Sequence, residues 1–82
     1  MSKREKELEK FRNNPKNVRF EELEALLIYL GFEKRQESTS HAVFSIQGRP
    51  PITIPRRKPF LKAYYVKLAL QAIDDLGLMD KE

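Results

Sequence analysis

The spacing of apolar residues changes at Gly31-Phe32, and this change constrains the fold more than any other feature of the chain. Before it, apolar side chains recur every three or four residues, which predicts a helix over 19–30. The residues of that stripe are Phe20, Leu23, Leu26, Leu27 and Leu30. After it, apolar and polar residues alternate, as they do in strands with one buried face. The chain is therefore predicted to be an α+β domain.

A second helical repeat covers 65–76, and Gly77 is predicted to end it because glycine accepts a left-handed backbone. The charged segment 2–13 predicts an accessory N-terminal helix, which Pro15 stops. Three antiparallel strands are expected near 33–37, 41–47 and 51–54. The predicted order is α-α-β-β-β-α, with the helices on one face of a three-stranded sheet and the other face left to solvent or a ligand.

The register of the first hairpin follows from the need to bury one face of the sheet. A three-residue turn at 38–40 places Phe32, Ala42, Phe44 and Ile46 on the buried face and Arg35, Glu37, His41 and Val43 on the other. A two-residue turn would separate Phe32 from Phe44, so the longer turn is favoured. Lys34 then falls on the buried side at an edge of the sheet. Prolines at 50, 51 and 55 predict that the third strand is short.

Length and composition exclude several classes of protein. Eighty-two residues fit one domain over 1–82, and the absence of cysteine together with a single histidine excludes disulfides, thiolate metal sites and histidine clusters. No metal or cofactor is expected. The longest apolar run, 25–30, is far shorter than a membrane span. We expect a soluble, cytoplasmic chain without a membrane partner.

The positive charge of the chain is concentrated in one segment. The net charge is +4, and residues 56–73 hold five bases and no acid. These bases are Arg56, Arg57, Lys58, Lys62 and Lys67. Such a segment is typical of a surface that binds a polyanion. A solvated basic loop without a partner is the alternative.

His41 is the only histidine of the chain, and histidine is the residue type whose unperturbed pKa lies near neutral pH. It follows a hydroxyl-rich turn that includes Ser40, and it falls on the open face of the predicted sheet near Arg35 and Glu37. A nearby carboxylate would orient the imidazole. A lone histidine is more often structural than catalytic, so both interpretations stay open.

Several short motifs in a fixed order resemble the HicA family of toxins. They are Asn14-Pro15-Lys16-Asn17-Val18-Arg19-Phe20-Glu21-Glu22-Leu23, Leu30-Gly31-Phe32, Ser40-His41-x-x-Phe44, Ile52-Thr53-Ile54-Pro55 and Tyr64-Tyr65-Val66-Lys67 with Leu70. The resemblance implies a double-stranded-RNA-binding-like core over 18–77, cleavage of mRNA, and inhibition by a HicB antitoxin that covers the active face. It also implies a free monomer that forms a hetero-oligomer with the antitoxin. Thr39 stands where the family usually has glycine.

RNA carries its own nucleophile, the 2′-hydroxyl, so one acid–base group and several cations suffice to cleave it without a metal. His41 is the predicted catalytic residue of this endoribonuclease. The predicted RNA-binding residues are Arg35, Ser40, Arg56, Arg57 and Lys58, with Lys62 and Lys67 further along the surface. The second proton transfer would fall to water, a lysine or Tyr64. A non-catalytic RNA-binding module is the alternative. A helix-turn-helix DNA-binding protein is disfavoured because no second helix lies close enough to 19–30.

Overall fold

The structure of the chain is a computed structural model that describes residues 3–36 and 40–78. Its elements are α1 (Lys3–Asn13), the short 3-10 helix η1 (Pro15–Asn17), α2 (Phe20–Tyr29), β1 (Glu33–Gln36), β2 (His41–Ile46), β3 (Arg49–Pro55) and α3 (Ala63–Leu76). The predicted α+β class and the order α-α-β-β-β-α are confirmed, with η1 inserted between the first two helices.

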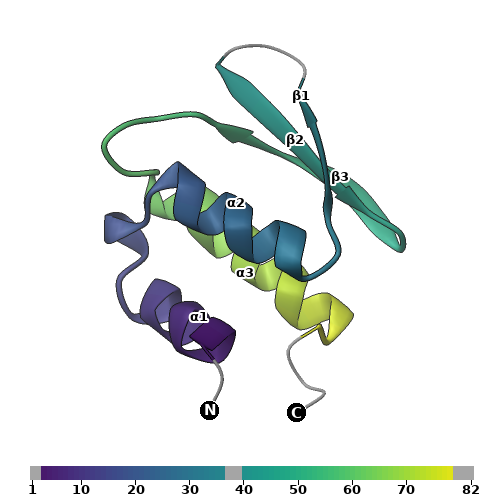
Figure 1. Cartoon of the computed structure of the whole chain (residues 1–82), viewed down its shortest axis with the longest axis horizontal. Coiled ribbons are helices and arrows are strands. Elements are labelled where there is room, and N and C mark those ends of the chain that lie inside the picture. Colours follow the sequence, from purple (N-terminus) through teal and green to yellow (C-terminus); the bar gives the residue numbers. More distant parts are fainter. Residues whose placement is uncertain (1–2, 37–39, 79–82) are drawn as a thin grey trace.

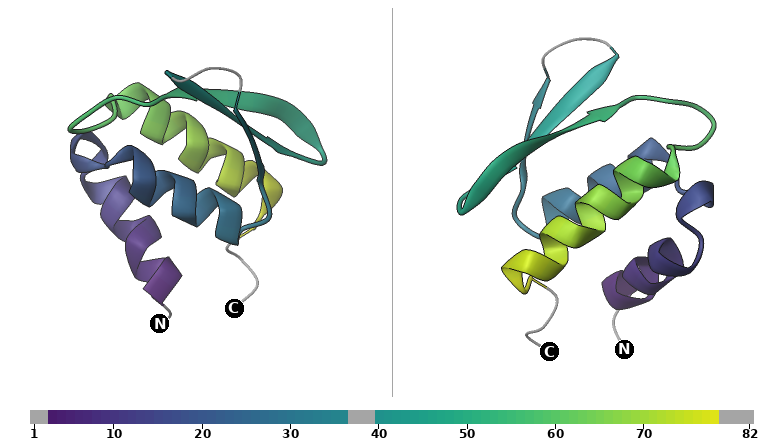
Figure 2. Two further views of the ribbon diagram at one scale, coloured as in Figure 1. Left: turned by 45° about the horizontal axis from the view of Figure 1, so that its top comes forward. Right: turned by 180° about the vertical axis from the view of Figure 1, so that it is seen from behind.

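The elements form a sheet above a layer of helices (Figure 1). The strands lie in the order β1-β2-β3, and both neighbouring pairs are antiparallel. Helices α2 and α3 run side by side under one face of the sheet and begin at the same end of the molecule, while α1 packs on the side of this layer that faces away from the sheet (Figure 2). The other face of the sheet is not covered by any described element. No described helix has the length and apolarity needed to cross a membrane.

The predicted register of the first hairpin is confirmed. Lys34 lies opposite Phe44 and Arg35 lies opposite Val43. Phe44 is completely buried, whereas Arg35 is exposed. Lys34 falls on the buried side, as expected, and its amine reaches the edge of the sheet to form an ion pair with Glu24 of α2. Of the predicted turn at 38–40, only Ser40 is among the described residues, and Glu37 also lies outside them.

The third strand is longer than predicted. Instead of 51–54, β3 spans Arg49–Pro55, so the prolines at 50 and 51 lie inside the strand. Two features permit this. The register shifts between Phe44 and Ile46, so that β3 carries an extra residue at a bulge. The strand also lies at the edge of the sheet, where a missing N–H does not interrupt a ladder on both sides.

The predicted glycine ending of the last helix is confirmed, and the start of that helix is corrected. Gly31 follows α2 with φ 108°, and Gly77 follows α3 in the left-handed conformation with φ 63°. Helix α3 begins at Ala63 rather than at Tyr65. No side chain caps this start, and the preceding chain is held instead by the Leu61 N–H, which donates to the Val18 carbonyl at 2.8 Å.

One hydrophobic core joins the sheet to all three helices. It includes the predicted stripes of α2 and α3, with Leu30 and Leu76 packed at its edge, and the inward-facing residues Ala42, Phe44, Ile52 and Ile54 of the sheet. Two residues of α1, Leu8 and Phe11, belong to the same cluster. Phe11 is only 1% exposed. Helix α1 therefore contributes to the core of the domain through these two side chains.

We expect the ion pair between α1 and α3 to make a small, pH-dependent contribution to stability. Arg12 Nη1 donates to Asp74 Oδ2 at 3.0 Å and Nη2 donates to Oδ1, and this hydrogen bond lowers the pKa of Asp74. A lowered pKa means that the contribution is present above the carboxyl pKa of the unfolded chain and is lost as the pH falls through the folded value. Asp74→Asn should lower the free energy of unfolding by less than about 1 kcal/mol at pH 7, because the pair is exposed.

This difference between Asp74→Asn and wild type should disappear in acid, where the aspartate is also neutral. Urea denaturation of both proteins at pH 7 and at pH 2.5 measures it. A difference that stays the same at both pH values would show that the charge of Asp74 is not what stabilises the helix pair.

Candidate nucleic-acid interface

His41 lies at the start of β2, exposed on the open face of the sheet. Its backbone pairs with that of Pro55 on β3. Its Nδ1 atom lies 3.0 Å from the Ser40 hydroxyl. That hydroxyl can accept a hydrogen bond from Nδ1–H or donate one to an unprotonated Nδ1. The Ser40 contact therefore fixes the orientation of the ring in either tautomer and leaves Nε2 as the atom for proton transfer.

One predicted cation shares this face with His41. Because Arg35 lies opposite Val43, it is a diagonal neighbour of His41, and residues in such a pair are about 7–8 Å apart. Its guanidinium lies 3.8 Å from the Glu33 carboxylate, and both side chains are well exposed. Val43 lies between Arg35 and Thr53 on the central strand and is only 6% exposed. Val43 therefore adds little apolar area to the face around His41.

Arg56 is held close to His41 by its backbone but not by its side chain. Its N–H donates to the Ser40 carbonyl at 2.8 Å, which ties the end of β3 to the residue before His41. Its half-buried guanidinium lies over the ring of Phe20, 5.0 Å from the centroid, at the start of α2. The Arg56 side chain thus lies on the helix side of the sheet.

The other predicted cations of the loop gather at the end of the molecule where α2 and α3 begin. Arg57, Lys58 and Lys62 are exposed there, and no described residue forms an ion pair with them. The Leu61–Val18 hydrogen bond brings this loop against the chain before α2. It thereby adds Lys16 and Arg19, which were not among the predicted site residues, to this end of the molecule. The positive ends of two helix dipoles point the same way.

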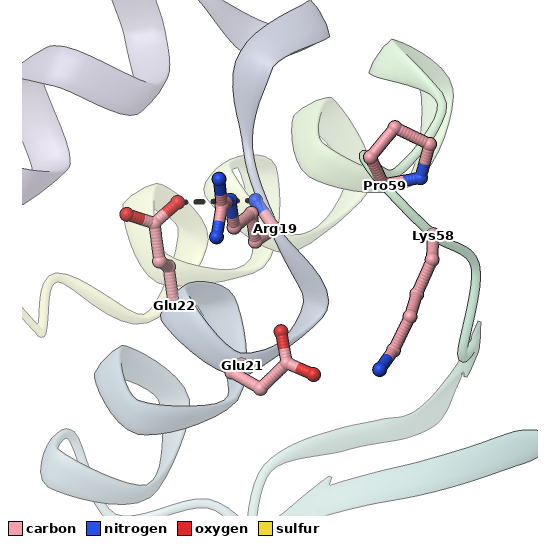
Figure 3. A pocket seen from close by; sticks show the side chains of 5 residues that line it. All are labelled: Arg19, Glu21, Glu22, Lys58 and Pro59. Carbon is pink, nitrogen blue, oxygen red and sulfur yellow. Dashed lines mark hydrogen bonds between the residues drawn. The ribbon is translucent and has the colours of Figure 1, made fainter.

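A cleft of about 660 Å³ opens between the loop and the first turn of α2. Its lining residues are Arg19, Glu21, Glu22, Lys58 and Pro59. Figure 3 shows the side chains of Glu21 and Lys58 pointing from opposite sides toward the same opening. Arg19 also lies over the ring of Phe60, 5.8 Å from its centroid. We call this opening the α2 cleft.

Two predicted residues lie away from His41. Lys67 lines a groove between α3 and α1 together with Arg12 and Asp74, on the side of the helix layer that faces away from the sheet. Tyr64, considered for the second proton transfer, is 66% exposed in the first turn of α3 and packs edge to face against Tyr65. Neither side chain shares the open face of the sheet with His41.

The residues of the interface include no evident metal site. Among residues 3–36 and 40–78, no group of three or more histidine, cysteine, aspartate or glutamate side chains could hold a metal ion.

The chain was also compared with known proteins. No protein-family model matches it, and neither the curated proteins nor the solved structures yield a match. The family resemblance and the double-stranded-RNA-binding-like fold stay predictions.

Proposed function

We propose that this chain is an endoribonuclease that cleaves mRNA with His41 as its acid–base catalyst. The observation that carries the proposal is the position of His41. Its imidazole is exposed on the open sheet face, is oriented by Ser40 at 3.0 Å, and has the basic loop beginning beside it at Arg56. Comparing RNA cleavage by wild-type protein and by His41→Ala tests the assignment.

The proposed reaction uses the 2′-hydroxyl of the RNA itself. His41 Nε2 accepts the hydroxyl proton, the 2′-oxygen attacks the phosphorus, and the bond to the 5′-oxygen breaks to give a 2′,3′-cyclic phosphate. Ser40 stabilises the protonated ring by accepting the Nδ1–H hydrogen bond. Arg35, on the same face, offsets the charge that develops on the phosphate oxygens. Water supplies the proton for the 5′-oxygen.

We place this activity in the cytoplasm, as the toxin of a toxin–antitoxin pair. The partner proposed from the family resemblance is a HicB-type antitoxin that covers the open face of the sheet. Because Val43 is nearly buried, this contact would depend on polar complementarity to His41, Arg35 and the basic loop more than on apolar burial.

A non-catalytic RNA-binding module is the second candidate, and the distribution of charge favours it. Lys58 lines the cleft at the first turn of α2, and Lys62 directly precedes α3. Arg35 is the predicted cation whose side chain shares the open face with His41. A protein that binds RNA without cleaving it does not need its cations to lie next to a histidine. The two candidates differ in whether the protein cleaves RNA and whether replacing His41 abolishes that cleavage.

RNA binding should depend on salt, and the slope should decrease when a cation of the basic end is removed. Arg57→Ala and Lys62→Ala should each reduce the slope of log K against log salt concentration by about 0.7, since each loses one contact to a single-stranded phosphate. Fluorescence anisotropy with a labelled RNA between 50 and 200 mM salt measures the slope. Lys6→Ala, an exposed lysine of α1, is the matched control and should leave the slope unchanged. Equal effects of all three variants would mean that binding follows net charge alone.

A further inference from the structure

The α2 cleft is lined by two carboxylates as well as by two cations, Arg19 and Lys58. Of its two glutamates, Glu22 is already engaged, because its Oε1 accepts the Arg19 N–H at 3.1 Å and its Oε2 lies 3.6 Å from Lys10 Nζ. Within the described part of the chain, no hydrogen bond or ion pair engages Glu21. Its carboxylate points into the cleft opposite Lys58 (Figure 3).

A cleft that bound only phosphate would not present a carboxylate, because it would repel the anion. A nucleobase is different, since its edge offers N–H donors that a carboxylate accepts. Guanine presents two adjacent donors, N1–H and the N2 amino group, that match both oxygens of one carboxylate. Adenine and cytosine present a donor next to an acceptor, and uracil presents one N–H between two carbonyls. The Glu21 carboxylate therefore fits guanine best.

The other cleft residues suit the rest of a nucleotide. Lys58 carries an amine, without an ion-pair partner among the described residues, on the opposite wall, where it can bind the phosphate. Arg19 lies over Phe60, which is 37% exposed, so a planar cation is supported by an aromatic ring at the edge of the cleft. Bases of single-stranded RNA stack on arginine planes and aromatic rings of this kind.

A short stretch of chain joins the cleft to the proposed reaction centre. Pro55, the strand partner of His41, is three residues before Lys58, a span of at most about 11 Å of extended chain. We propose that the α2 cleft binds a guanine nucleotide of single-stranded RNA near the cleavage position, with Glu21 selecting the base and Lys58 holding the phosphate. This inference rests on the proposed RNA-directed function and adds a base preference to it.

Binding of oligonucleotides that cannot be cleaved tests this inference apart from catalysis. The probes are 2′-O-methyl hexauridylate and the same oligonucleotide with one central guanosine. Wild-type protein should bind the guanosine probe at least about fivefold more tightly, as expected for one good bidentate base contact. Glu21→Gln should bring the ratio close to one, while Glu9→Gln, the same change of charge on an exposed position of α1, should preserve it.

Equal binding of both probes by wild-type protein, or a preference that survives Glu21→Gln, would overturn the inference. Free guanosine 5′-monophosphate tests whether the cleft binds a mononucleotide or a nucleotide within RNA. If it binds as tightly as the guanosine probe, the cleft is a site for free nucleotides rather than for RNA. A protein that cleaves RNA without a guanine preference would refute only this inference. A protein that shows the preference but does not cleave RNA would refute only the catalytic proposal.

Discussion

Replacing His41 with alanine should lower the rate of RNA cleavage by about 10²–10⁴-fold, the usual contribution of a positioned acid–base group. RNA affinity should change little, because the cations of the loop remain. Cleavage by wild-type protein should also persist in excess EDTA. Gel assays with a labelled mRNA, run with both proteins purified in parallel, measure the rates. Equal cleavage by mutant and wild type would indicate a contaminating nuclease and would favour the non-catalytic module.

A modified substrate sharpens the same test. An RNA with one 2′-deoxy nucleotide at the cleavage position lacks the nucleophile, so it should bind normally and resist cleavage at that position alone. Cleavage that continues at the deoxy position would show that water rather than the 2′-hydroxyl attacks the phosphorus. His41 would then need a different role from the one proposed.

Replacing Phe11 with alanine should lower the free energy of unfolding by about 3–5 kcal/mol, the cost of emptying a fully buried aromatic site. This is a large share of the roughly 5–15 kcal/mol that stabilises a typical domain. Phe11 is 1% exposed and belongs to the same core as the sheet residues. The loss should therefore appear in a single unfolding transition of the whole domain, measured by urea denaturation.

Phe60→Ala is the matched control for this substitution. Phe60 is 37% exposed and contacts the Arg19 guanidinium, so its loss should cost less than about 1 kcal/mol. Similar small losses in both variants would show that α1 separates from the domain before the rest unfolds.

The architecture could be predicted from the sequence wherever one face of an element had to be buried. Phe32 and Phe44 had to share a face, and this requirement alone selected the register that pairs Arg35 with Val43. Element boundaries without such a requirement were less predictable. The start of α3 has no capping side chain and depends on a hydrogen bond between Leu61 and Val18, two residues far apart in the sequence.

The candidate site could be predicted only in part, and the reason lies in side-chain direction. The exposure of His41 followed from its position two residues before Val43 on the outer face. The same alternation along β3 places Arg56 on the inner side, with the buried Ile52 and Ile54, whereas the basic run was predicted to form one patch. The α2 cleft was not predictable, because its walls meet only after the loop folds onto the start of α2.

The prolines of β3 have a consequence for self-association. Exposed strand edges offer rows of N–H and C=O groups on which other chains can add strands, and this leads to aggregation. In β3, Pro50, Pro51 and Pro55 have no N–H to offer. At the opposite edge, β1 is only four residues long, and its Lys34 and Arg35 side chains disfavour close approach of another strand. Both edges thus disfavour the addition of strands from other molecules. The three-stranded sheet is therefore a poor template for aggregation.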